Sequence, residues 1–168
     1  RRDLTNSIRE KLEATAFGTE AAGDAPAGLL GTVKYTGVDD HVGIVKMIRD
    51  VKQANALKGG GFVTNAEGEA KLITTPIDAA NPYGFLSTGE KILNYPLEVS
   101  EGVANVGDEA GAIFANWSDF VVLQWGALNI TVDNITQARE GVVRFIINSF
   151  WDYGFRRDES FVTASIPL

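Results

Sequence analysis

The chain has 168 residues, of which 45% are hydrophobic and 22% charged, so it is long enough for one ordinary core and at most two lobes. It contains no cysteine, which excludes disulfide scaffolds, thiolate metal sites and cysteine nucleophiles. Its net charge of -7 and its short basic runs argue against binding that neutralises many phosphates, and no apolar stretch approaches the roughly 20 residues of a membrane helix.

The first part of the chain predicts two helices joined by a flexible connection. Apolar residues recur at every fourth position near the N-terminus, which predicts an amphipathic helix over residues 3–16. The helix ends at the glycine that begins a Gly- and Ala-rich connection, residues 18–31. Asp39 and Asp40 then offer an N-cap for a second helix over residues 41 to about 54, whose wide apolar face predicts contact with the core.

The middle of the chain is expected to hold little regular structure. Residues 62–64 read as a short strand, and residues 65–91, with two prolines and several glycines, read as loops. Residues 92–99 form a strand only at an edge or a bulge, because Pro96 lacks the N–H that a central strand donates. A polar turn over residues 102–109 follows.

The last part, residues 111–168, is rich in β-branched and aromatic residues and reads as successive strands. Residues 142–155 fit either a strand or a helix by periodicity, and their lack of Leu, Lys and Glu favours the strand. We expect it to be largely buried and paired with residues 123–132. The strand breaks are predicted at four places: Asn116, Gly126, Asp133-Asn134 and Gly141.

This order of elements, with helices first and several strands last, predicts an α+β fold in which the rest of the chain covers the C-terminal sheet. We find no internal repeat and no low-complexity tail.

Two features suggest a phosphate-binding loop and a metal or catalytic site, but their sequence context does not fit either kind of site. The glycines at 59–61 suggest a phosphate loop, but Lys58 precedes them and a strand follows, the reverse of the order that a phosphate loop needs, so a turn is favoured. His41 is the single histidine, which rules out a site with two histidine ligands from one chain, and no GxSxG motif supplies a nucleophilic serine. We interpret His41 as a surface residue in the first turn of a helix.

Acidic residues are plentiful, and two of them would suffice for a catalytic acid/base pair. The conspicuous groups have structural interpretations instead. Asp133 begins a turn, and Asp158 and Glu159 lie beside Arg156 and Arg157, which predicts an ion-pair cluster at a surface or an interface.

The final stretch also holds many aromatic residues and three Asn-X-Ser/Thr sequences. Without a signal peptide, these acceptor patterns carry little weight for glycosylation. The aromatic side chains form either a sugar-binding platform or, as is commoner, part of a core. They are Trp117, Trp125, Phe145, Phe150, Trp151, Tyr153 and Phe155.

Four segments in order resemble the major capsid protein of tailed bacteriophages, the Hong Kong 97-like fold, over nearly the whole chain. The N-terminal helix and its connection, closing on APAGLL at residues 25–30, resemble the end of the family's spine helix and its "G…PxGL" link. ILNYPLEVS at 92–100 is similar to "LxGxPVxxS", and FANWSDFVV at 114–122 to "xGDFSxYxI". Residues 142–161, ending YGFRRDESF, resemble the closing strand and the "R…dG…AF" ending.

The resemblance implies a partial subunit with an axial lobe and part of a peripheral lobe. Residues 1–36 would be a peripheral segment, 37–119 the axial lobe, 120–158 the peripheral β-sheet, and 159–168 a closing strand that returns to the axial lobe. The family's N-terminal arm, its extended hairpin loop and most of its spine helix would lie upstream of this sequence, so the chain is expected to be the second half of a subunit.

Two of the resembling segments depart from the family at a glycine position, where Asn94 and Ala115 stand instead. Asn adopts a left-handed backbone more easily than Ala does. Some family members crosslink a Lys of the hairpin loop to an Asn near the final long strand. With the loop missing, Asn148 and Asp152 match that site only loosely, and we do not expect crosslinking here.

The function that the resemblance implies is structural, with no catalytic, cofactor-binding or metal-binding residues. The subunit would form pentamers and hexamers in a shell around double-stranded DNA, without sequence-specific contact, in a virion assembled in the bacterial host cytoplasm. Portal, scaffold, maturation protease and decoration proteins are the further partners, and no membrane is involved. The alternatives are an encapsulin-like nanocompartment shell and, from another class, a carbohydrate-binding or hydrolytic domain using the C-terminal aromatic and acidic residues.

Overall fold

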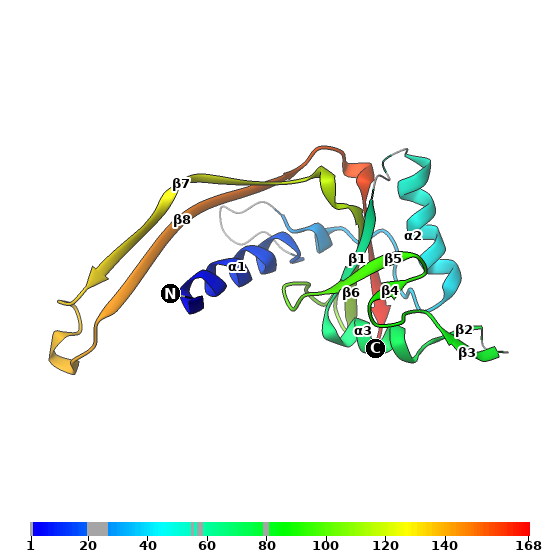
Figure 1. Cartoon of the computed structure of the whole chain (residues 1–168), viewed down its shortest axis with the longest axis horizontal. Coiled ribbons are helices and arrows are strands. Elements are labelled where there is room, and N and C mark those ends of the chain that lie inside the picture. Colours follow the sequence, from blue (N-terminus) through cyan, green and yellow to red (C-terminus); the bar gives the residue numbers. More distant parts are fainter. Residues whose placement is uncertain (1, 20–26, 55, 57–58, 79–80) are drawn as a thin grey trace.

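The computed structural model describes residues 2–19, 27–54, 56, 59–78 and 81–168. A lobe built on a five-stranded sheet carries helices on its sides, and a long two-stranded ribbon, β7 and β8, projects from it (Figure 1). The mixture of helices and strands confirms the predicted α+β class.

The first helix forms as predicted. α1 spans Arg2–Ala16, and its last turn continues into Phe17, whose N–H donates to the carbonyl of Glu13 at 2.8 Å. The short 3-10 helix Leu29–Gly31 then places Leu30 in the core. Residues 20–26 of that connection lie outside the described residues.

The second helix begins at the predicted cap. α2 spans His41–Gln53, and the Asp40 carboxylate accepts a hydrogen bond from the N–H of Gly43 at 2.6 Å. Its apolar face is narrower than predicted, because Val42 and Val45 are exposed. The side chains that it buries are Ile44, Met47, Ile48 and Val51.

The main sheet has the strand order β4-β5-β1-β6-β9. β1, Gly60–Thr64, confirms the predicted short strand; it pairs in parallel with β5, Tyr95–Val99, and antiparallel with β6, Glu109–Asn116. β6 also pairs antiparallel with β9, Phe161–Pro167. β5 lies between β4, Lys91–Ile92, and β1, so the prediction of an edge strand is wrong. Pro96 lies opposite Lys91 of β4, which is only two residues long and forms the edge of the sheet.

The prediction of loops over residues 65–91 is wrong. This segment forms α3, Ala66–Thr74, followed by a small hairpin of β2, Pro76–Asp78, and β3, Asn81–Phe85. The Asn65 side chain caps α3 by accepting from the N–H of Gly68 at 3.0 Å. Because α3 is a short helix that buries Leu72 as its one large side chain, it leaves little apolar periodicity in the sequence.

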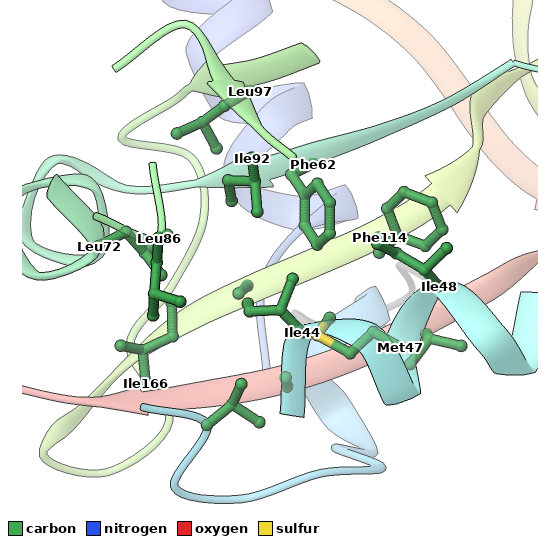
Figure 2. Close-up of a cluster of buried hydrophobic side chains, with 14 of the residues drawn as sticks. Ile44, Met47, Ile48, Phe62, Leu72, Leu86, Ile92, Leu97, Phe114 and Ile166 are labelled. Atoms are coloured by element: carbon green, nitrogen blue, oxygen red, sulfur yellow. The ribbon is translucent and has the colours of Figure 1, made fainter. Parts of the chain in front are cut away.

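The core occupies both faces of the five-stranded sheet. On one face, alternate residues of β6, including Phe114, pack with α2, α3 and the side chains of Phe62 and Leu97 (Figure 2). On the other face, Ile113 and Ala115 of β6 pack with Leu30, Val103 and the partly buried Phe17 that follows α1, among others. Successive side chains of a strand point to opposite faces, so β6 is buried on both sides.

The ribbon confirms the predicted pairing and contradicts three other expectations. β7, Phe120–Asp133, pairs antiparallel with β8, Arg144–Phe155. The two strands form a sheet of their own, so the C-terminal strands do not build one sheet. β8 is largely exposed, where a buried strand was predicted. The expected break at Gly126 is a register shift inside a continuous strand, with Gly126 at φ 78°.

Candidate functional site

The features first considered for catalysis remain separate in the structure. His41 is the first residue of α2 and is partly exposed, as predicted, and Lys58 lies outside the described residues. Gly59 has φ 127°, in keeping with a turn. Among the described residues, no group of three His, Cys, Asp or Glu side chains is arranged to hold a metal ion.

Asp133 occupies the predicted turn at the tip of the ribbon. Its carboxylate accepts from the N–H groups of Ile135 and Thr136 at 2.9 and 3.0 Å. Hydrogen bonds from the side chain and the backbone of Thr136, and then from the backbone of Ile135, lower the pKa of Asp133 to about 2. The carboxylate therefore organises a turn and is not placed for acid/base work.

The ion-pair cluster predicted at the other end of the ribbon does not form within the single chain, and the alternative at an interface stays a prediction. Arg156, Arg157, Asp158 and Glu159 are exposed, and no ion pair joins them in the part of the chain that the structure describes. The residues form the start of a short 3-10 turn, Asp158–Ser160, that leads from β8 into β9.

The base of the ribbon is held by an aromatic cluster. Phe120 of β7 has its ring centroid 5.7 Å from that of Phe155 of β8 and 6.2 Å from those of Phe17 and Trp117. Phe161 joins the cluster, 4.8 Å from Phe155. Core packing is thus confirmed for the aromatic residues at this end.

A partly buried cluster of hydrogen-bonded polar side chains lies at the same place. Asp119 accepts from the hydroxyl of Ser160 at 2.5 Å and from the side-chain amide of Asn116 at 3.2 Å. Its backbone carbonyl accepts from the N–H of Arg156 at 2.9 Å. These bonds join the chain segments that enter and leave the ribbon, so the base of the ribbon is fixed to the lobe.

Beyond its base the ribbon exposes large apolar side chains on both faces. We call the face toward α1 the inner face; there the Tyr153 hydroxyl donates to the carbonyl of Thr15 at 3.1 Å, and Ile147 and Trp151 line a hollow beside α1. The outer face carries Trp125 and Phe150, which lie directly opposite each other and are 83% and 71% exposed. Core packing, the commoner role expected for these aromatics, is therefore wrong for the outer face.

Asn148 and Asp152 lie on the outer face of β8 and are exposed. Asn148 is opposite Asn129, and the Asp152 carboxylate accepts from the N–H of Tyr153 at 2.8 Å. Lys11 of α1 and Asn148 line the same hollow, whereas Asp152 is not part of its lining. The loose match to a crosslinking site gains no support from this arrangement.

The largest hollows are open grooves. One of about 720 Å³ lies between α1 and the segment that follows β5, and its rim carries Glu10, Glu13, Glu98 and Glu101. Glu13 is held by Arg9 at 3.4 Å and by the hydroxyl of Ser100 at 2.8 Å. No helix within the described residues has the length and apolar character needed to cross a membrane.

The chain matches one protein-family model and several solved structures. The model of the "Phage capsid family" matches residues 1–166. A structure from Mycobacterium phage Che8 superposes with a TM-score of 0.62 at 16% identity, covering 97% of this chain and 59% of that one. A structure from Gordonia phage Cozz gives 0.71 at 12% identity, covering 99% and 62%.

A shell of another kind is similar as well. The holo-SrpI encapsulin complex from Synechococcus elongatus superposes with a TM-score of 0.68 at 13% identity, covering 98% of this chain and 63% of that one. No curated protein matches the chain.

The chain spans about 59 to 64% of the length of the first structures that it matches. At these identities the superpositions establish a shared fold, which confirms the expected Hong Kong 97-like architecture. The family model adds a match to nearly the whole sequence. The chain therefore belongs to the phage capsid family.

Proposed function

We propose that the chain is part of a phage or prophage major capsid subunit that associates with copies of itself into pentamers, hexamers and an icosahedral shell. The observation that carries this proposal is an apolar ribbon, exposed on both faces, in a member of the phage capsid family. In such a subunit the role is structural, without catalysis or a cofactor.

The ribbon is hard to explain in a protein that works alone. A two-stranded sheet is at best marginally stable in water by itself. Contiguous apolar surface of this kind marks an interaction site on soluble proteins, and both long edges of the ribbon expose unpaired backbone groups. Contact with further copies would cover the ribbon, and many modest contacts per subunit would make the shell stable.

The charge of the chain supports packaging of DNA by an external motor. A net charge of -7 disfavours the coat as a condensing agent for a polyanion. The shell would enclose double-stranded DNA without sequence-specific contact, in a virion assembled in the host cytoplasm. Portal, scaffold, maturation protease and decoration proteins are the partners expected of such a shell.

The division into lobes follows the same proposal. Residues 37–119 would form the axial lobe, which the closing strand at 159–168 joins by pairing with β6. Residues 1–36 and 120–158 would belong to the peripheral lobe, which includes α1 and the ribbon.

An encapsulin-like shell is the second candidate, because the SrpI complex superposes as well as the phage structures do. The two candidates differ in content. Shells purified from the native host would contain DNA in the first case and a protein cargo in the second, which nuclease-protected nucleic acid and mass spectrometry distinguish.

Sedimentation velocity of the Trp125→Ser/Phe150→Ser variant tests the proposal. We produce the wild type and the variant from the complete open reading frame and compare them over a concentration series. The wild type is expected to form oligomers, and the variant to stay smaller with an unchanged melting temperature, because both side chains are exposed in the single chain. Leu168→Ser, which also removes an exposed apolar side chain, is the control and should behave as the wild type. A wild type that sediments as a monomer throughout would contradict the proposal.

A further inference from the structure

The outer surface of α2 is a cationic and apolar stripe in an acidic protein. Val45 and Lys46 follow Val42 by three and four residues, and Arg49 follows them by four and three, so these side chains adjoin on one face of the helix. Val42 and Val45 are 57% and 41% exposed, whereas the opposite face of the helix buries four large side chains in the core. Arg49 is paired with Asp50 at 2.9 Å, whereas Lys46 has no ion-pair partner among the described residues, so Lys46 is the cation that the stripe offers to another molecule.

The groove beside α1 has the complementary character. Its floor includes Phe17 and Val99, which offer apolar surface to the valines, and its rim carries four glutamates against one arginine. Glu13 is already engaged by Arg9 and Ser100. Glu10 and Glu98 are exposed and, within the described part of the chain, have no ion-pair partner.

The stripe and the groove lie on opposite sides of the main sheet. α2 packs on the face that includes Phe114, whereas Phe17 and Val63 at the groove pack on the face that includes Ile113. In Figure 1, α1 and α2 accordingly stand on either side of the sheet. One chain cannot bring its own stripe into its own groove, but two copies side by side can.

We propose that the α2 stripe of one copy binds in the groove of the next, as a head-to-tail contact between identical chains. Lys46 would approach Glu98 of the neighbouring copy, with Val42 and Val45 covering the apolar floor. Such a heterologous contact closes into a ring when the rotation per copy fits. The inference rests on the proposed shell function and assigns the surfaces through which copies would meet around a ring.

Charge reversal at the two surfaces tests the contact. Lys46→Glu and Glu98→Lys are made in the complete open reading frame, singly and together, and ring formation is followed by sedimentation velocity at low and high salt. Each single change should raise the concentration for half-assembly about fivefold or more, because it replaces an attraction by a repulsion. The double variant should recover most of the assembly, since the pair is restored with its signs exchanged. Lys91→Glu and Asp108→Lys make the same charge changes at exposed positions away from both surfaces and should assemble as the wild type.

The outcomes separate this contact from the shell function itself. If the wild type assembles and the two single variants assemble equally well, the α2 contact is wrong and the shell function stands. A double variant no better than the singles would also overturn the contact. A wild type that remains monomeric would overturn the shell function and this contact with it.

Discussion

At the scale of single residues, Asp50 shows how the segment before α2 is fastened to the helix. Its carboxylate forms ion pairs with Lys34 at 2.6 Å and Arg49 at 2.9 Å, and accepts from the Tyr35 hydroxyl at 2.6 Å. Partial burial alone would raise the pKa of Asp50, but the hydrogen bonds from Lys34, Tyr35 and Arg49 outweigh it and lower the pKa to about 2. Asp50 therefore stabilises the fold in its charged form.

This gives a prediction about pH. Because the folded pKa lies below the ordinary value of 3.8, the stabilisation is complete above about pH 4 and is lost as the pH falls toward about 2. Asp50→Asn should lower the unfolding free energy by about 1–2 kcal/mol at neutral pH. The difference from the wild type should shrink in acid, as measured by urea unfolding. The control is Asp39→Asn, an exposed change nearby that should have little effect at any pH. A wild-type advantage that persists unchanged at about pH 2 would contradict the assignment.

The sequence predicted some residues' roles and could not predict others. Asp40 as the cap of α2 and Asp133 in a turn follow from short-range rules, because the hydrogen-bonding partners lie within three residues. The partners of Asp50 include Lys34 and Tyr35, which the fold brings near. Asp119 and Ser160 are 41 positions apart and meet at the base of the ribbon, a contact that no local pattern encodes.

At the scale of elements, the ribbon depends on one irregular position. Gly126 has φ 78°, and the register shifts between Trp125 and Asn129, so the strand continues through a bulge. In the sequence a glycine there reads as a strand end. Only the pairing partner on β8 distinguishes a bulge from a turn.

Gly126→Ala therefore should destabilise the ribbon by about 1 kcal/mol, since a residue with a Cβ is strained at positive φ even where space is open. Amide exchange over residues 120–133 and 144–155 should become several-fold faster, while the five-stranded sheet is unaffected. Gly154→Ala is a matched control on the other strand, with open space and no positive φ, and should leave exchange unchanged. Equal exchange in the two variants would show that the conformation of Gly126 is not required.

The elements were predicted where local signals agree. α1, α2 and the pairing of β7 with β8 follow from periodicity and composition, whereas α3 was missed because one large buried side chain makes no pattern. The burial of β8 was predicted wrongly for a physical reason. Hydrophobic composition indicates that a strand will be covered, but a single chain does not reveal whether the cover comes from itself or from another copy.

At the scale of the whole molecule, the family and its fold were predicted from four degenerate segments taken in order, and the comparisons confirm both. In the turn between β4 and β5, Leu93 and not Asn94 has a positive φ, at 55°. The proposed assembly contact lies beyond sequence patterns, because it would join surfaces from opposite sides of the sheet.

Electron microscopy of the protein purified from its complete open reading frame tests the central claim most directly. The account predicts capsomer rings or closed shells, with single particles that show the ribbon covered by neighbouring copies. Dispersed monomers under every assembly condition, with the ribbon free, would contradict it.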